Sequence, residues 1–397
     1  MSICCYDLLT LSCFQTIKLI SGEKGLYRQV TWPYICTDSI VSQWVHGGEL
    51  IFITGAGFEA TDDNLISIMN ECITKSLAGL VLVSGDKQFR DVSERLIQYS
   101  EENSLPIFLM NMDTKIVDVT QEISELILKR REQFKQSQLL LDRILFSNED
   151  NTNFNEFYDL FNISDKPYRF ISIFNMASIK DNTDISSHIK NDLMNYLYHQ
   201  CNNKSKSLIT LESSNNIICL ASAEHIQLID DLKQSIHNVF QKISLRYNDS
   251  IRMYLGCGRV YPDGSKSNIR LSFQEAQRAI TLLKKKLFNG NLLFYEDIGI
   301  YKLLYEIKNI DELKSFYESN LGLLIKSDIK SSGNLVDTLR CYLKNNCSLV
   351  NTAQDLYIHR NTLIYRLNTI KEILQKDLND SSVRFELHMS LLAYDFQ

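Results

Sequence analysis

The sequence predicts an α/β protein with an all-α C-terminal part, divided into three domains and one helical linker. Apolar runs alternate with amphipathic stretches over residues 1–117, which is typical of a parallel α/β domain. Residues 151–300 follow the order strand, helix, strand, strand, helix, strand, which is the order of a ferredoxin-like domain. Residues 301–397 show helical periodicity throughout, and a helix-turn-helix pattern lies near their end.

The first domain is predicted from three short apolar runs, which are ELIFIT (49–54), GLVLVS (79–84) and LPIFLM (105–110). The stretches between them, 61–76 and 89–104, have the apolar spacing of helices, so short connections join strands and helices in alternation. Ligands of open α/β sheets bind beyond the carboxyl ends of the strands, which makes the loops after the first two runs the candidate ligand edge. The candidate ligand-binding residues there are Thr54, Gly55, Gly57, Ser84 and Asp86.

Residues 118–150 are predicted to be a helical linker. The part up to residue 146 contains neither proline nor glycine, and steps of four and three residues select a stripe with two polar interruptions. The stripe consists of Ile123, Ile127, Arg130, Phe134, Ser137, Leu141 and Ile144. Two interpretations are open, namely a coiled coil that pairs two subunits and a single long helix that packs on its own domains.

The middle domain is predicted from strand-like runs at 168–176 and 251–258 and helical stretches at 184–200, 223–243 and 272–286. Between the two halves, the apolar runs SLIT and IICLA flank the polar turn SSNN (213–216). Two apolar runs around a short polar turn indicate a β-hairpin.

The C-terminal domain contains the motif AQDLYIHRNTLIYRL, residues 353–367. We expect a short helix over 348–356, a turn over 357–359 and a second helix over 360–374, which together make a helix-turn-helix. The first residues of the second helix of that motif face base edges in the major groove of DNA. The residues predicted to contact DNA are His359, Arg360, Asn361, Thr362, Tyr365 and Arg366. The simpler interpretation is that HRNT only caps a helix in an ordinary bundle.

Charge limits where DNA could bind. The chain has a net charge of −6, so a basic surface must be local. Residues 359–376 carry four Lys and Arg side chains and one Glu, a local net charge of +3. The polar tetrapeptide therefore lies in a segment that can attract phosphates.

Cysteine usage and the N-terminus suggest the compartment. The ten cysteines contain no C-x-x-C pair, and most lie in apolar runs, so we expect reduced, mostly buried thiols. The N-terminal segment lacks a basic region and contains Asp7, which argues against a signal peptide, and no apolar run reaches the ~18 residues of a membrane span. These features predict a cytoplasmic protein.

The segment TAQDLYIHRNTLIYRL resembles the C-terminal signature of the PucR family of bacterial transcriptional regulators. The resemblance continues in LVDTLRCYLKNNCSLVNTA and RFELHMSLLAY, and LSFQEAQRAITLL and FYEDIGIYKLL resemble the GGDEF-like middle domain of those regulators. GGELIFITGAGF, GLVLVSG and LPIFLMNMDTKIVDVTQEI resemble their N-terminal sensor domain. The resemblance implies a ligand-responsive, DNA-binding regulator of catabolic genes that acts as a homodimer or larger homo-oligomer.

An enzyme related to diguanylate cyclases is the alternative. Such an enzyme needs a Gly-Gly turn for its nucleotide and carboxylates for divalent metal. The corresponding turn here, Ser213–Asn216, has neither, and the preceding strand ISIFNMAS has no carboxylate. We therefore expect no enzymatic activity.

Cofactor and metal sites are not predicted. GAGFEA (55–60) follows a strand and precedes a helix, as a phosphate-binding turn would, but Glu59 would repel an anion. A tight turn that needs small residues is the favoured interpretation. The seven histidines show no metal-ligand spacing such as H-x-x-x-H.

The first prediction concerns catalysis. Purified protein incubated with GTP and Mg²⁺ or Mn²⁺ should form no cyclic dinucleotide, because the turn at Ser213–Asn216 offers no carboxylate to hold the metal. Chromatography of the nucleotides after incubation measures this. Turnover above that of heat-denatured protein would contradict it.

Overall fold

The computed structural model describes residues 3–37, 40–56, 61–84, 92–111, 113–147, 166–178, 183–202, 205–263, 265–307, 309–331 and 333–396. The chain divides into two compact units, Met1–Ile280 and Thr281–Gln397. None of the helices in the described residues has an apolar stretch long enough to span a lipid bilayer. The ten cysteines are free thiols, seven of them buried, as expected from the sequence.

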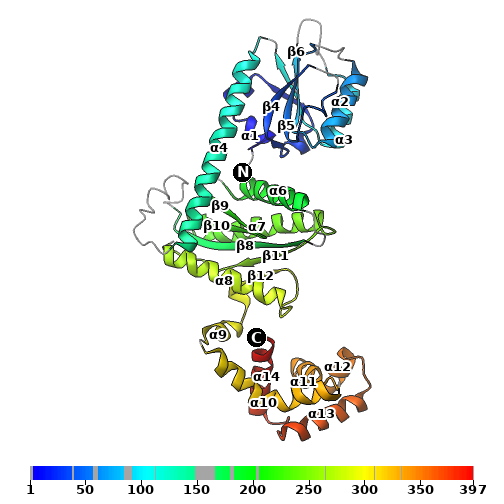
Figure 1. Ribbon diagram of the computed structural model, residues 1–397, viewed down its shortest axis with the longest axis vertical. Helices are drawn as coiled ribbons and strands as arrows, with labels where there is room; N and C mark the ends of the chain where they lie inside the picture. The colour runs from blue at the N-terminus through cyan, green and yellow to red at the C-terminus, as the bar shows by residue number, and fades with distance from the viewer. Residues whose placement is uncertain are drawn as a thin grey trace. The chain divides into compact units, whose positions relative to one another are not determined.

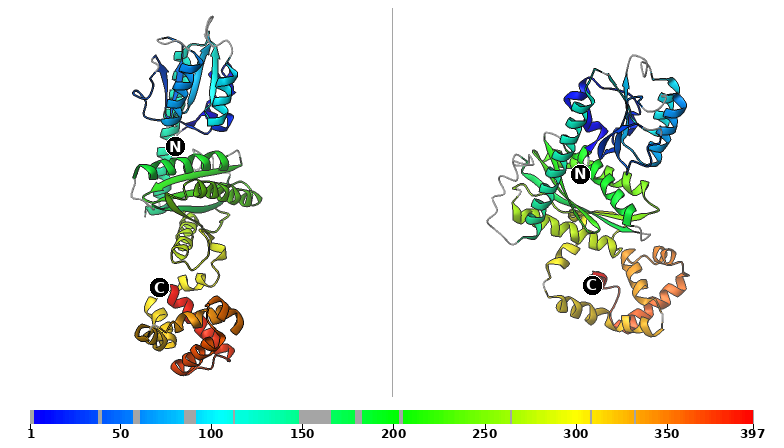
Figure 2. Two further views of the ribbon diagram at one scale, coloured as in Figure 1. Left: turned by 90° about the vertical axis from the view of Figure 1, so that its right-hand side faces the viewer. Right: turned by 45° about the horizontal axis from the view of Figure 1, so that its top comes forward.

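The N-terminal part of the first unit is built on a five-stranded sheet (Figures 1 and 2). Strands β4 (Trp32–Cys36), β5 (Glu49–Ile53), β6 (Gly79–Ser84) and β7 (Ile107–Asn111) are parallel neighbours in this order. Strand β2 (Lys18–Ser21) pairs antiparallel with β7 at the edge. The three predicted runs are β5, β6 and β7, and the parallel α/β arrangement is confirmed.

The two faces of this sheet are covered by different helices, as Figure 1 shows. Leu50 and Phe52 of β5 face a core that includes the first turns of helix α4 (Ile116–Phe146). Ile51 and Ile53 of the same strand face helices α2 (Asp62–Thr74) and α3 (Glu94–Asn103). Successive side chains of a strand point to opposite faces, and because both faces are covered the strand is apolar throughout.

Helix α4 runs through 31 residues and contributes to two cores at its two ends. Val119, Ile123 and Ile127 are buried against the N-terminal sheet. Leu141 and Ile144 are buried in the core of the middle domain. The predicted stripe is thus used for packing within the chain, which favours the second interpretation of the linker. Pairing between subunits stays a prediction, and it would have to use exposed side chains of α4 such as Leu128 and Leu139.

The middle domain follows the predicted element order. It consists of β8 (Tyr168–Ser178), α6 (Thr183–Cys201), β9 (Lys206–Ser213), β10 (Asn216–Ala223), α7 (Gln227–Arg246), β11 (Ile251–Cys257) and α8 (Lys266–Lys284). Strands β11, β8, β10 and β9 follow one another in this order, and each neighbouring pair is antiparallel. The end of α4 and helix α8 pack on one face of this sheet. The predicted start of the domain, residue 151, lies outside the described residues.

The hairpin predicted at SSNN is present, because Ser213 pairs with Asn216 across a two-residue turn. Ser214 adopts a left-handed conformation there, with φ of 46°. Lys190 of α6 donates to the Ser214 carbonyl oxygen at 2.6 Å and to Glu212 Oε1 at 2.8 Å. The Lys190 side chain of α6 therefore holds this turn in place.

The second unit contains strand β12 (Leu292–Phe294) and then helices α9 (Tyr301–Glu306), α10 (Ile310–Ser331), α11 (Leu335–Lys344), α12 (Leu349–Asp355), α13 (Arg360–Leu374) and α14 (Ser381–Phe396). Helices α10 to α14 share one apolar core, in which Leu321, Leu339, Leu363 and Leu387 are fully buried. The predicted all-α C-terminal part with a helix-turn-helix is confirmed.

Glu122 of α4 fixes the short 3-10 helix Ser12–Gln15 to the N-terminal domain. Its carboxylate accepts from the Ser12 backbone N–H at 2.9 Å, the Ser12 hydroxyl at 2.8 Å and the Cys13 backbone N–H at 3.0 Å. Hydrogen bonds from Cys13 and Ser12 lower the pKa of Glu122 to about 2. The ionised form is thus favoured in the folded chain.

The second prediction follows from this carboxylate. A pKa below the ordinary 4.5 means that its contribution is present above about pH 4.5 and is lost as the pH falls towards 2. Glu122→Gln should lower the free energy of unfolding by about 1 kcal/mol at pH 7, and the difference from wild type should shrink between pH 4.5 and 2. Thermal unfolding at several pH values measures both effects.

The matched control is Glu125→Gln on the same helix. The Glu125 carboxylate accepts only an exposed i,i+4 hydrogen bond from Gln121 among the described residues. Its replacement should change stability by a few tenths of a kcal/mol. Equal effects of the two substitutions at every pH would contradict the role of Glu122.

Candidate nucleic-acid interface

The helix-turn-helix is formed by α12 and α13. The Ser348 hydroxyl caps α12 by accepting from the Asn351 backbone N–H at 3.3 Å. Helix α12 ends at Asp355, and α13 runs from Arg360 to Leu374 as predicted. Serine is a favoured N-cap because its oxygen satisfies an amide that the helix leaves unpaired.

The turn between the helices holds Tyr357 in a left-handed conformation, with φ of 51°, and leaves its side chain 95% exposed. Ile358 packs against the helical core, and its backbone N–H donates to the Ala353 carbonyl at 3.0 Å. A non-glycine residue with positive φ costs free energy, which the anchored Ile358 offsets here. Ile358 is thus the apolar contact of the turn.

His359 is the N-cap of α13. Its Nδ1 accepts from the Asn361 backbone N–H at 3.2 Å. In the neutral ring the proton must then lie on Nε2, which is left as a donor. Capping and contact with DNA are therefore compatible roles for this side chain, because they use different nitrogens.

Burial of one stripe orients the rest of α13. Leu363, Leu367 and Ile370 are buried, at steps of four and three residues. The side chains of α13 before Leu363 are exposed, Tyr365 is 72% exposed, and Arg366 and Thr369 are half-buried. The exposed candidate DNA contacts are His359, Arg360, Asn361, Thr362 and Tyr365.

Arg366 differs from these five residues. It is half-buried, and its Nη1 donates to the Thr338 hydroxyl of α11 at 3.3 Å. A guanidinium has five N–H donors, so this bond leaves others to reach a phosphate. Its replacement would alter the packing of α13 on α11 as well as any contact with DNA.

The local positive charge is smaller in the structure than the sequence suggests. Lys371 lies 3.7 Å from Asp377, and Lys376 lies 2.6 Å from Glu386. Two of the four cations in 359–376 are thus paired with carboxylates outside that range. The positive charge available on α13 for contact with DNA phosphates therefore comes mainly from exposed Arg360, and half-buried Arg366 adds to it.

Two acidic side chains hold the helices that support α13. Asp328 of α10 accepts from the backbone N–H groups of Leu335 and Val336, both at 2.8 Å, and so caps α11. Asp395 of α14 accepts two hydrogen bonds from Arg340 of α11, at 2.7 and 3.1 Å. These bonds connect α10, α11 and α14 around the buried stripe of α13.

The candidate ligand residues of the N-terminal domain are only partly described. Thr54 and Gly55 follow β5, and Ser84 ends β6, so they lie at the carboxyl edge of the parallel sheet. The Thr54 hydroxyl accepts from the Ala56 backbone N–H at 3.3 Å, which forms a local turn. Gly57 and Asp86 lie outside the described residues. A ligand site at this edge stays a prediction.

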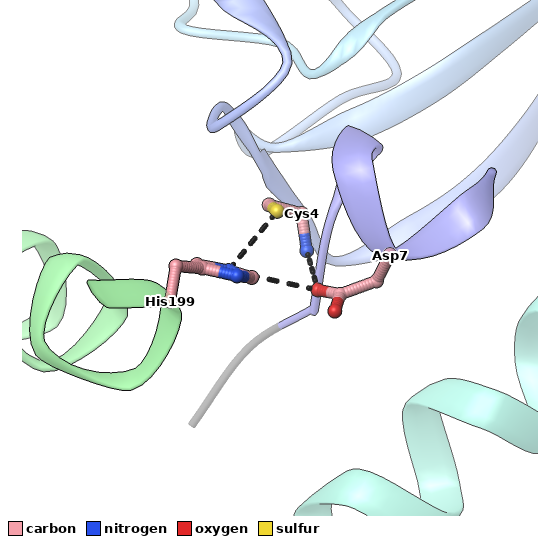
Figure 3. Close-up of side chains that lie close together, drawn as sticks. All are labelled: Cys4, Asp7 and His199. Atoms are coloured by element: carbon pink, nitrogen blue, oxygen red, sulfur yellow. Dashed lines mark hydrogen bonds and ion pairs between the residues drawn. The ribbon is translucent and has the colours of Figure 1, made fainter. Parts of the chain in front are cut away.

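A further cluster was not singled out from the sequence. Cys4, Asp7 and His199 place one ligand atom each within 4.8 Å of one another (Figure 3). Cys4 and Asp7 are three residues apart, but His199 comes from a helix 195 residues from Cys4. Only the C-x-x-D spacing is visible in the sequence, and that spacing alone is common.

Comparison with known proteins identifies both ends of the chain. Residues 7–127 match the purine catabolism regulatory protein-like family, and residues 335–393 match the PucR C-terminal helix-turn-helix domain. The chain carries a PucR-type N-terminal domain and a PucR C-terminal helix-turn-helix domain. The predicted resemblance to PucR-type regulators is thus confirmed. Neither match covers the middle domain, so its GGDEF-like character stays a prediction.

Similar curated proteins are transcriptional regulators rather than enzymes. The proline-responsive transcriptional activator PutR of Bacillus subtilis is 31% identical over 211 residues, which are 51% of this chain and 49% of PutR. The DNA-binding transcriptional activator AdeR of the same organism is 28% identical over 55% of this chain and 51% of its own length. The purine catabolism regulatory protein of B. subtilis is 38% identical over 22% of this chain and 16% of its own length. The chain spans about half the length of PutR and AdeR.

The third prediction tests the scaffold of α13. Asp328→Ala should lower the free energy of unfolding of the second unit by about 1–2 kcal/mol, because two backbone N–H groups at the start of α11 lose their acceptor. Asp311→Ala is the matched control, since Asp311 lies in the first turn of the same helix α10. Denaturant unfolding of the two variants measures this, and an unchanged midpoint for Asp328→Ala would contradict it.

Proposed function

We propose that this chain is a DNA-binding transcriptional regulator of catabolic genes whose helix α13 enters the major groove. The observation that carries the proposal is the exposed run from His359 to Thr362 at the start of the second helix of a helix-turn-helix. The match of residues 335–393 to the PucR helix-turn-helix domain supports it. So do the descriptions of PutR and AdeR, which are transcriptional activators.

The side chains of the run suit base edges. Arg360 is exposed and can donate two parallel hydrogen bonds to guanine O6 and N7. Asn361 is exposed and can bond adenine N6 and N7 in the same bidentate way. Thr362, Tyr365 and the Nε2 of His359 are available for further bases or phosphates. Arg366 is assigned to the backbone of DNA, because its bond to Thr338 holds it close to α11.

Specificity requires more than one copy of this motif. One recognition helix reads few base pairs, while a genome offers many competing sites. Two subunits whose recognition helices are about 34 Å apart would read two half-sites one DNA turn apart. We therefore assign the chain to a homodimer or a larger homo-oligomer acting on double-stranded operator DNA in the cytoplasm.

The middle domain is assigned as a ferredoxin-like, degenerate GGDEF-like domain without catalysis. The strand order β11-β8-β10-β9 with helices α6 and α7 between the strands supports the ferredoxin-like topology. At the hairpin turn, Lys190 donates to the Ser214 carbonyl, so a cation occupies the place where a metal-binding turn would offer anions. This counts against the alternative of a nucleotide-cyclising enzyme.

A small-molecule effector is assigned to the N-terminal domain. The carboxyl edge of its parallel sheet, at Thr54, Gly55 and Ser84, is the place where open α/β sheets bind ligands. PutR is described as proline-responsive, and another relative is described as a purine catabolism regulatory protein. The names of the relatives therefore refer to different metabolites. The effector of this chain is a small catabolic metabolite, to be identified by a thermal-shift screen.

The fourth prediction tests the DNA contacts. DNA sites are first selected from a random pool with the wild-type chain. Arg360→Ala should weaken binding to them by about 1–3 kcal/mol, roughly 5- to 150-fold, and should relax the preference at one base pair. Arg366→Ala should weaken all sequences alike and reduce the slope of log K against log salt by about 0.9. Gel-shift titrations at several salt concentrations measure both.

The control is Lys314→Ala, which removes a cation from the exposed surface of α10 in the same unit. Its binding should stay within twofold of wild type. The folding of each variant is checked by circular dichroism, because Arg366 also contacts α11. Wild-type affinity in folded Arg360→Ala would refute the assigned orientation of α13.

A further inference from the structure

Three side chains with metal-binding atoms converge at the N-terminal segment of the first unit (Figure 3). Cys4 ends strand β1 (Ile3–Cys4), and Asp7 lies in the short helix α1 (Cys5–Leu8). His199 comes from the last turn of α6. Cys4 Sγ lies 3.1 Å from His199 Nε2, and Asp7 Oδ2 lies 3.8 Å from the same nitrogen.

We propose that Cys4, Asp7 and His199 form a binding site for one divalent transition-metal ion, with zinc as the best fit. Thiolate, carboxylate and imidazole are all ligands that zinc takes in proteins. Hard cations such as Mg²⁺ and Ca²⁺ prefer sites made of oxygen alone, so the thiol and the imidazole select against them.

The spacing of the ligand atoms fits a tetrahedral ion. With zinc bonds of about 2.3 Å to sulfur and about 2.1 Å to nitrogen and oxygen, tetrahedral angles put S and N about 3.6 Å apart and N and O about 3.4 Å apart. The observed separations of 3.1 and 3.8 Å differ from these values by about 0.5 and about 0.4 Å, in opposite directions.

The neighbouring groups hold the ligands in place. The backbone N–H of Cys4 donates to Asp7 Oδ2 at 2.8 Å, which fixes the carboxylate and leaves it lone pairs for a metal. The ring of Tyr198 meets His199 edge-on at 5.3 Å between centroids, and Tyr27 does so at 5.4 Å. The hydrogen bond to Asp7 is the kind of outer contact that orients a metal ligand, and the two rings limit the orientations open to the His199 imidazole.

The charges of the ligand side chains also suit a divalent cation. Binding replaces the S–H bond of Cys4 by a sulfur–metal bond and releases the proton to solvent. Thiolate and carboxylate then offset the two charges of the ion. Arg130 lies 4.0 Å from Asp7 and over the ring of Tyr198. Its charge opposes the cation, so both anionic ligands are needed to offset it and the affinity for metal should fall when either is removed.

Access and an open coordination position follow from burial. The Cys4 side chain is buried, whereas the side chains of Asp7 and His199 are about a tenth exposed. Tyr6 and Tyr27, which border the cluster, are about half exposed. An ion would enter from the side of these rings, and with three protein ligands its fourth coordination position would be left for water. A bound ion would join the β1–α1 segment to α6 of the middle domain.

The test uses Co²⁺, whose bond to a thiolate gives a charge-transfer absorption in the near ultraviolet. Untagged full-length chain is reduced, treated with a chelator, exchanged into chelator-free buffer and titrated with Co²⁺. The expected result is a sulfur-to-cobalt band that saturates at one ion per chain and disappears when Zn²⁺ is added. Absence of the band in the wild-type chain would refute the site.

Variants then assign the ligands. Cys4→Ser should abolish the band, while His199→Gln and Asp7→Asn should weaken Co²⁺ binding at least about tenfold. Cys13→Ser and His225→Gln are the matched controls and should bind as wild type, because Cys13 contacts Glu122 and His225 is largely exposed beside Glu224. Thermal unfolding checks each variant. If Cys4→Ser unfolds, the His199→Gln variant is used to test whether the cluster binds the metal. The His199 side chain lies in the last turn of α6, whereas Cys4 is buried in the β1–α1 segment. A band that persists in folded Cys4→Ser, or is unchanged in His199→Gln, would overturn the proposal.

Discussion

The burial of one apolar stripe on α13 is the constraint on which the candidate DNA surface depends. Burial of Leu363, Leu367 and Ile370 turns the opposite side of the helix outwards, and at about 100° per residue that side includes Asn361 and Tyr365. Arg360 lies three residues before Leu363 and seven before Leu367, on the side of the stripe itself, and it is exposed because the helix begins there. The stripe thus fixes the direction of Asn361 and Tyr365, whereas the start of the helix after the His359 cap leaves Arg360 exposed. The caps at Ser348 and His359 then fix where each helix begins.

The supporting bonds around this stripe explain why the polar surface can be rigid without being part of the core. Asp328 closes the start of α11, and Arg340 joins α11 to Asp395 of α14 with two hydrogen bonds. Arg366 is bonded to α11 on the flank of the same surface. A recognition surface held in this way loses little conformational entropy when it binds, which raises its affinity.

Helix α4 performs a different task in the first unit. One end is buried with Ile123 and Ile127 in the N-terminal core, and the other end is buried with Leu141 and Ile144 in the core of the middle domain. A ligand that binds two arrangements of the N-terminal domain with different affinity would act on a helix that is part of both cores. The three residues Cys4, Asp7 and His199 offer a second connection between the same two domains.

The sequence by itself determined the elements whose signal is local. Helical and strand periodicity located β5, β6, β7, the hairpin at Ser213–Asn216 and α13, because each of these patterns repeats within a few residues. The polar run at His359–Thr362 was found in the same way. Tertiary structure alone decided the pairing of Lys371 with Asp377 and of Lys376 with Glu386, which reduces the local positive charge. It alone placed Arg366 against Thr338, and it alone brought His199 to Cys4 across 195 residues. Such contacts join separate helices and segments, and no pattern within one segment shows which partner folding will bring to it.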